Sequence, residues 1–402
     1  MVANDTNQLE GSFKVGFNML VIENGIVLRG LNLKPERANI AIENERIIEI
    51  SRGKIPSDHK INARGCIIAP GFINAHVHVA DSILKDVGDG KSINEIVKPP
   101  NGLKHRMLEA AGDDEIIKSI RDSIIEMIST GTTTFIDYRE GGIKGIKLLK
   151  NALKDLPINS IILGRDPIFL EGNPDTTKLK NRIKKLLKFA DGIGPSGFGE
   201  IIDETAKIIV EECEKRDKIA SIHVAETTEA QKSSLEKTGK SEVERAIDAG
   251  FHLLVHLTNP IPGDLKLVLE NDASIVVCPR SNGMLSTGIP PIAEIREKNV
   301  NILLGTDNVM FNAPDMLREM EYTLKVTRAY KRGYFNPRDV LKMATTNMHG
   351  FTGDKIGCIS EGFQADIIIV ESLSGNPYLS LINRSQSKNI RYVIIKGRIV
   401  KR

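Results

Sequence analysis

Two histidines one residue apart are the first sign of chemistry in this sequence. His76 and His78 end the apolar run PGFINAHVH at residues 70–78. In a β-strand, side chains at positions i and i+2 point to the same side, so both imidazoles can reach one point. A divalent metal ion commonly occupies such a point. Because a lone His-x-His pair also arises by chance and in core packing, the metal hypothesis depends on further ligands elsewhere in the chain.

Further ionisable side chains stand where apolar stretches of the sequence end. They are His223, Glu226, His256 and Asp307. Each closely follows a run rich in Ile, Val, Leu or Ala, which is typical of a buried strand. If these strands belong to one barrel, their ends meet at one face. A metal site is therefore favoured over a chance pair of histidines.

The middle of the chain alternates between strand and helix patterns, as a barrel requires. Strands are predicted at 132–138, 158–164, 192–199, 219–225, 252–257, 273–278 and 301–306. The clearest helical pattern runs from Asp113 to Thr130, before Gly131, which suits a C-cap. With the strand that carries His76, eight strand–helix units fit between about residues 68 and 350. This predicts an α/β fold, a (β/α)₈ TIM barrel with its active site at the C-terminal strand ends.

Both ends of the chain have a different pattern, with short strands and little sign of helix. Strands are predicted at 18–28, 38–51 and 60–68, and again at 365–371 and 391–401, where a turn is expected at 396–397. We expect a small β-sandwich domain built from residues 1–67 plus 351–402. The catalytic barrel domain would then span residues 68–350.

Composition excludes several classes of partner. The 402 residues include 55 basic and 52 acidic side chains, a net charge of +3. This balance, without a long basic block, predicts no nucleic-acid or membrane partner. Residues 1–16 lack the apolar core of a secretory signal, and the four cysteines lack metal-knuckle spacing. We expect a cytoplasmic protein, and a homo-oligomer is compatible with the sequence.

Taken together, the motifs resemble the amidohydrolase superfamily, specifically its branch of cytosine-deaminase-like and chlorohydrolase-like aminohydrolases. The matching strings are PGFINAHVH (70–78), HVAE (223–226), VH (255–256), CPRSN (278–282), GTDN (305–308) and GFQAD (362–366). They follow the order of the superfamily and span nearly the whole chain. The resemblance implies a metal-dependent hydrolase with a barrel and a β-sandwich.

The resemblance also implies roles for the strand-end residues. The ligands of one divalent metal ion, most often zinc, with iron or manganese as alternatives, would be His76, His78, His223 and Asp307. Such an ion lowers the pKa of a bound water toward about 7. Glu226 would carry a proton to a ring nitrogen of the substrate and to departing ammonia. Asp307 would take the proton of the water, and His256 would steady the developing negative charge.

A second metal ion is not expected. Superfamily members with two metals resemble one another in a carboxylated lysine at the end of strand four, and residues 192–200 of this chain contain no lysine. Glu200 could bridge two metals instead, although a carboxylate outside the metal shell is the preferred interpretation. One metal ion is therefore favoured.

Candidates for substrate binding are Arg139, Arg165, Ser281, Asn282 and His105. The two arginines follow predicted strands and could clamp a carboxylate or phosphate, with a salt bridge to a loop acid as an equal alternative. Ser281 and Asn282 belong to the motif CPRSN. His105 lies in an unusually long loop, 81–112, which suits a lid or specificity element.

Two of the histidines also have interpretations without a role in substrate binding. His105 could instead be exposed loop charge. The loop that carries it departs from the aromatic-containing stretch expected in the deaminase branch, which leaves the substrate open. His252, four residues before His256, is expected to be a hydrogen-bonded core histidine.

The predicted reaction is hydrolytic deamination of a small amino-substituted nitrogen heterocycle, purine-like or pyrimidine-like. The closest alternative is hydrolysis of another C–N or C–Cl bond, including cyclic amide opening as in imidazolonepropionase-like members. A catalytically inactive scaffold is the alternative of a different class. It is disfavoured because the metal ligands and the Glu226 carboxyl are all present.

Overall fold

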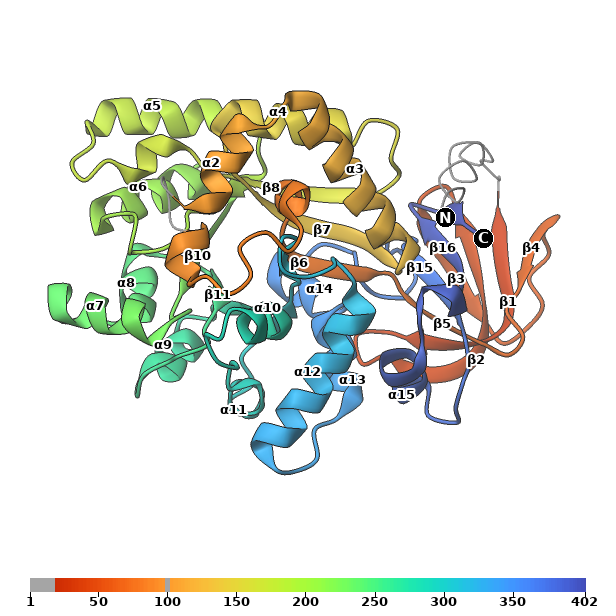
Figure 1. Cartoon of the computed structure of the whole chain (residues 1–402). Helices are drawn as coiled ribbons and strands as arrows, with labels where there is room; N and C mark the ends of the chain where they lie inside the picture. Colours follow the sequence, from red (N-terminus) through yellow and green to blue (C-terminus); the bar gives the residue numbers. More distant parts are fainter. Residues whose placement is uncertain (1–18, 98–101) are drawn as a thin grey trace.

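The computed structural model describes residues 19–97 and 102–402. Residues 1–18 and 98–101 lie outside this description. They include the first 16 residues, which were searched for a secretory signal, and part of the long loop 81–112. The chain forms a barrel of parallel strands beside a second sheet built from both chain ends (Figure 1). Among the described helices, none has the length and hydropathy needed to cross a membrane.

A nine-stranded parallel sheet forms the barrel, in the order β13-β12-β11-β10-β9-β8-β7-β6-β14. Its strands are β6 (Phe72–His78), β7 (Thr132–Arg139), β8 (Asn159–Gly164), β9 (Gly192–Ile193), β10 (Ile219–Val224), β11 (Leu253–His256), β12 (Ser274–Val277), β13 (Ile302–Leu304) and β14 (Asp307–Asn308). Only two residues separate β13 from β14, so these two short strands share one position in the barrel, which we call the stave of β13 and β14. The barrel therefore has eight strand positions. The predicted (β/α)₈ fold is confirmed.

Two predicted strands differ from the structure in length. The strand expected at 192–199 ends at Ile193, and a loop that contains Pro195 and Gly197 follows. Proline lacks the N–H that a central strand needs, and Gly197 has a φ of 155°. The single strand expected at 38–51 is two strands, because Asn44 takes a left-handed turn conformation with a φ of 54°.

Helices surround the barrel, and several of them bury an apolar face. They are α1 (Ile93–Val97), α2 (Leu103–Ala110), α3 (Asp113–Ser129), α4 (Gly142–Ala152), α5 (Thr176–Leu186), α6 (Asp203–Glu214), α7 (Thr228–Thr238), α8 (Glu242–Ala249), α9 (Asp264–Glu270), α10 (Pro279–Met284), α11 (Ile292–Glu297), α12 (Met316–Lys331), α13 (Pro337–Met343), α14 (Asn347–Thr352) and α15 (Pro377–Leu379). In α3, Ile116, Ile120 and Ile124 are buried at helical spacing, and Gly131 follows the helix with a φ of 90°. The helix and its stop signal are as predicted.

The second sheet joins strands from both termini in the order β17-β16-β15-β5-β1-β2-β3, with β4 paired to β1. Its strands are β1 (Leu20–Arg29), β2 (Lys34–Glu43), β3 (Arg46–Ser51), β4 (His59–Asn62), β5 (Cys66–Pro70), β15 (Ile367–Glu371), β16 (Ile390–Ile395) and β17 (Arg398–Lys401). The turn expected at 396–397 joins β16 to β17, and both of its residues have positive φ. The β-rich ends therefore meet, as the sequence predicted, and they form one eight-stranded sheet.

Alternating side chains of this sheet serve two cores. Ile68 and Ile367 belong to a core made of residues from the terminal sheet and its loops. Ile67 and Ile368 belong to the larger core that the sheet shares with the barrel helices. Successive strand residues point to opposite faces, so two buried faces require a continuous apolar run. We propose that the two bodies are domains, with boundaries near residues 67 and 351.

Closure of the barrel depends on contacts between β6 and the stave of β13 and β14. A Cβ added to Gly305 would lie 2.7 Å from the Cβ of His76, so the backbones approach too closely for any side chain. The side chain of Asn74 donates to Thr306 Oγ1 at 2.7 Å and accepts from Thr306 N at 3.0 Å. These contacts hold β14 parallel to β6, with Asp307 opposite Val77.

The variant Asn74→Ala is expected to destabilise the protein by about 2–4 kcal/mol, because two buried groups of Thr306 lose their partner. The free energy of unfolding, measured by denaturant titration, tests this. Asn151→Ala, at an exposed position of α4, is the matched control and should stay within about 0.5 kcal/mol of the wild type. An Asn74→Ala loss no larger than that of the control would contradict the assigned role.

Candidate metal centre and active site

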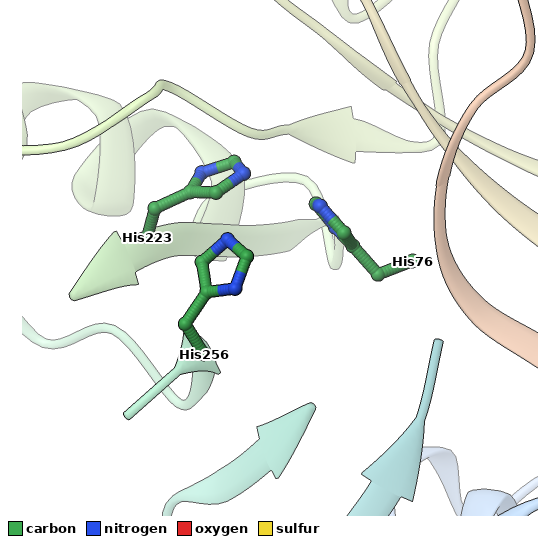
Figure 2. A group of neighbouring side chains, drawn as sticks. All are labelled: His76, His223 and His256. Carbon is green, nitrogen blue, oxygen red and sulfur yellow. The ribbon is translucent and has the colours of Figure 1, made fainter. Parts of the chain in front are cut away.

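The strand ends bring three histidines of distant sequence position together. His76 comes from β6, His223 from β10 and His256 from the last position of β11. Their imidazoles point toward one another (Figure 2), and one nitrogen of each lies within 4.8 Å of the others. A second group with the same spacing contains His76, His78 and Asp307. Because His76 belongs to both groups, the five side chains form one cluster at the C-terminal ends of the barrel strands.

Asp307 is the carboxylate at the centre of this cluster. Its Oδ1 lies 3.1 Å from His76 Nε2 and 3.5 Å from His78 Nε2. Burial favours the neutral carboxyl, but the hydrogen bond from His76 and the nearby imidazoles hold the pKa of Asp307 well below its usual range. Asp307 is therefore an ionised carboxylate among histidine side chains.

Three histidines of the cluster, His76, His78 and His223, are neutral bases at ordinary pH. Burial lowers the pKa of His76, and it lowers the pKa values of His78 and His223 further. A neutral imidazole has a lone pair for a metal, whereas an imidazolium has none. The cluster therefore has the protonation state that a metal ligand needs.

Hydrogen bonds outside the cluster set the orientation of two imidazoles. His223 Nδ1 donates to the carbonyl oxygen of Pro195 at 3.0 Å, which leaves Nε2 as the lone-pair nitrogen. The amide of Asn282 donates to His256 Nδ1 at 3.2 Å, so the proton of the His256 ring lies on Nε2. His223 is thus prepared to accept a metal, and His256 is prepared to donate a hydrogen bond.

Ser281 and Asn282, the predicted substrate-binding residues of the CPRSN motif, are fully buried. Ser281 Oγ donates to Asp307 Oδ2 at 2.5 Å, and Asn282 contacts His256 as described. In the structure these two side chains contact the strand-end residues Asp307 and His256, and neither lines the cavity beside them.

The residues fit a divalent cation by their donor chemistry. His76 Nδ1 and His78 Nδ1 are buried without a hydrogen-bond partner among the described residues, and the other ring nitrogen of each faces the single carboxylate of Asp307. One hydrogen bond from His76 to Asp307 therefore leaves further nitrogen donors of the cluster unsatisfied. A cation that binds nitrogen and oxygen donors, such as zinc, would complete the cluster.

Four residues in or beside the cluster have positive φ although none is glycine. The values are 51° for Ala225, 77° for His256, 49° for Leu257 and 59° for Asp307. Such conformations cost free energy and concentrate at functional sites. Ala225 is held in place by the buried carboxyl of Glu242, which accepts its backbone N–H at 2.8 Å.

Beside the cluster lies a cavity of about 360 Å³ whose walls include His78, His223, Glu226, His256 and Asp307. We call it the reaction chamber. Glu226 follows β10, and its Oε1 lies 3.7 Å from His256 Nε2. Burial raises the pKa of Glu226 above that of an ordinary glutamate. The chamber thus combines the cluster with a carboxyl that can hold a proton.

Arg165 lines the reaction chamber, but its guanidinium is engaged by acids. It lies 2.9 Å from Glu140 and 3.4 Å from Glu200. The geometry therefore contains the loop salt bridge that the sequence left as an alternative to an anion clamp. Glu200, considered as a metal bridge, contacts this arginine.

Arg139 and His105 line a second, neighbouring cavity of about 480 Å³. Arg139 is buried, 3.7 Å from Asp137, and His105 Nε2 contacts the carbonyl oxygen of Val97 at 2.9 Å. Neither side chain lines the reaction chamber itself. Their predicted contact with substrate stays a hypothesis.

Some residues near the cluster were outside the sequence prediction or contradict it. Lys104 is buried and lines the reaction chamber, yet nothing in the loop sequence distinguishes it from its neighbours His105 and Arg106. Tyr138, whose ring lies 4.1 Å from that of His76, was hidden in an apolar strand. The prediction for His252 was wrong, because it precedes β11 and is exposed.

Comparisons with known proteins agree with this geometry. A model of the amidohydrolase family matches residues 67–400. A protein of Methanothermobacter thermautotrophicus, provisionally named an aminohydrolase, is 58% identical over 385 residues, which are 96% of this chain and 100% of the relative. The 5-methylthioadenosine/S-adenosylhomocysteine deaminase of Pyrococcus abyssi is 26% identical over 404 residues, covering 95% of this chain and 93% of the relative.

The fold also matches a solved structure. The atrazine chlorohydrolase of Arthrobacter aurescens, complexed with zinc, superimposes with a TM-score of 0.84 at 18% identity, over 95% of each chain. The family match spans the barrel, with its buried histidine and aspartate cluster, and the C-terminal strands. This chain belongs to the amidohydrolase family.

Proposed function

We propose that this protein catalyses the hydrolytic deamination of a small amino-substituted nitrogen heterocycle at a single divalent metal ion, with zinc favoured. The observation that carries the proposal is the meeting of a buried histidine and aspartate cluster with Glu226 in one chamber. In the net reaction, water adds to the ring carbon that bears the amino group. The C–N bond breaks, ammonia leaves, and the ring keeps an oxo group.

The proposed metal ligands are His76, His78, His223 and Asp307. Bound there, a divalent ion would lower the pKa of a water molecule toward about 7 and polarise the reacting carbon. The neutral histidines and the ionised Asp307 support this assignment. Asp307 can also accept the proton of the attacking water, since Ser281 holds its second oxygen in a fixed orientation.

Glu226 and His256 are the proposed proton-handling and charge-stabilising groups. Because burial raises its pKa, Glu226 can hold a proton and deliver it to a ring nitrogen and then to departing ammonia. His256 can donate from Nε2 to oxygen that gains negative charge during the attack. The 3.7 Å between the two side chains lets both act on one ring.

The named relatives support deamination over the alternatives. One relative that aligns with 95% of this chain is a deaminase of adenine nucleosides by name, so adenine derivatives belong in any screen. Hydrolysis of a C–Cl bond or of a cyclic amide uses the same water activation and is the closest rival. An inactive scaffold would have no reason to keep every member of the cluster.

The remaining expectations are proposals as well. We propose that the enzyme works in the cytoplasm on a free small molecule, without a nucleic-acid or membrane partner. The near balance of charge supports this. A homo-oligomer is compatible with the chain.

Proton delivery by Glu226 can be tested once a substrate is known. An ammonia-release screen across nucleobases, nucleosides, triazines and S-adenosyl derivatives should identify a substrate. With it, Glu226→Gln should lower kcat/KM by about 10²- to 10⁴-fold while metal content stays unchanged, because the amide cannot deliver a proton. Glu236→Gln, on the exposed side of α7, is the control. Full turnover by Glu226→Gln would refute the assignment.

Metal content and thermal stability test the proposed ligand set. Freshly purified protein should contain about one divalent ion per chain, and chelation should abolish activity and lower the thermal unfolding midpoint, because ligand binding stabilises the folded state. Zinc should restore both. His223→Ala should bind much less metal, whereas His252→Ala, at an exposed position outside the cluster, should bind as the wild type does. Equal metal content in these two variants would contradict the ligand set.

A further inference from the structure

Helix α2 buries one residue, a lysine that lines the reaction chamber. Of the residues in α2, only Lys104 is buried, and it is 3% exposed. Burying an ammonium group is costly unless the charge is paired and hydrogen-bonded. A buried lysine on an otherwise half-exposed helix therefore needs an explanation beyond packing.

Two carboxylates hold the ammonium group in place. Lys104 Nζ donates to Asp81 Oδ2 at 2.7 Å and lies 2.8 Å from Glu140 Oε1. Burial alone would lower the pKa of Lys104, but these two acids raise it, so the side chain is charged at neutral pH. An ammonium group has three N–H donors, and two acids can take two of them. At least one donor remains for another acceptor.

Lys104 borders the space where a substrate ring would sit. Lys104 lines the reaction chamber together with His78, Glu226 and Asp307. The remaining N–H donor is therefore available to a molecule bound in front of the cluster.

The charge balance of this wall decides what kind of acceptor it suits. On this wall, Lys104 and Arg165 are surrounded by three carboxyl groups, those of Asp81, Glu140 and Glu200. The other two cations that line the chamber are Lys237, which is exposed, and Arg245, which pairs with Asp203. Beside Lys104 itself, no positive charge is left over for a carboxylate or phosphate of a substrate. A neutral oxygen can still accept a charge-assisted hydrogen bond without adding a negative charge.

We propose that Lys104 is a specificity-determining residue that donates to a ring oxo group of the substrate. The substrate class is then an amino-substituted heterocycle that also carries a neutral ring oxygen. This inference rests on the proposed function, because it names a feature of the molecule that the reaction chamber takes. Lys104 selects the ring through the oxo group, while the cluster and Glu226 carry out the reaction.

The test compares rings that differ only in the oxo group. Isoguanine is paired with adenine, and cytosine with 4-aminopyrimidine. Calorimetric dissociation constants and kcat/KM for ammonia release are measured on the metal-loaded wild type and on Lys104→Met. The wild type should bind the oxo ring of at least one pair about tenfold or more tightly, as expected for one hydrogen bond to a charged group. In Lys104→Met, the difference should shrink to about twofold or less.

Two further variants keep the result interpretable. Asp81→Asn combined with Lys104→Met removes the acid that the single variant leaves unpaired, so it serves if the single variant folds poorly. Lys150→Met, at an exposed position of α4, is the matched control and should keep the wild-type preference.

Several outcomes would overturn the inference. These are equal binding of both rings by the wild type, a preference retained without Lys104, tighter binding of a carboxylated ring such as orotate, or no binding of any ring. Failure of the proposed function has a different signature, since a ring could bind with the oxo preference and yet release no ammonia.

Discussion

The parallel pairing of β14 with β6 is the constraint on which the site depends. It closes the barrel and sets Asp307 opposite Val77, between the two histidines of β6. The pairing is possible because Gly305 lets the two backbones come together, and Asn74 fixes its register through Thr306. A shift of one residue would turn Asp307 away from the histidines, since side chains alternate along a strand. The carboxylate thus enters the cluster through closure of the barrel.

Burial then gives the cluster its chemical character. Removing His76, His78 and His223 from water keeps them neutral, and their proximity keeps Asp307 ionised although it is buried. Contacts from Pro195 and Asn282 fix which nitrogen of His223 and His256 carries the proton. A rigid barrel can hold such an arrangement because the ligands belong to strands and their partners to short segments that follow them.

The loops above the barrel supply the wall that distinguishes substrates. Helix α2, the segment after β6 and the loops after β7 and β8 contribute Lys104, Asp81, Glu140 and Arg165, which form a network of paired charges beside the chamber. In barrel enzymes the strand ends carry the chemistry while the loops vary. The network is accordingly where this chain sets its own specificity, and the neighbouring cavity of about 480 Å³ lies on its other side.

The sequence alone determined the fold class and the residues of the cluster, because strand alternation and barrel topology bring strand ends to one face wherever they lie in the chain. It did not determine which side chains enter from the loops. Lys104 and His105 are adjacent basic residues of the same loop. In the tertiary structure Lys104 lines the reaction chamber, whereas His105 contacts a backbone carbonyl oxygen. Likewise, only the packed structure shows His252 exposed and Ser281 bound to Asp307. Loop side chains follow no period, so their direction is decided by the charges and cavities against which they pack.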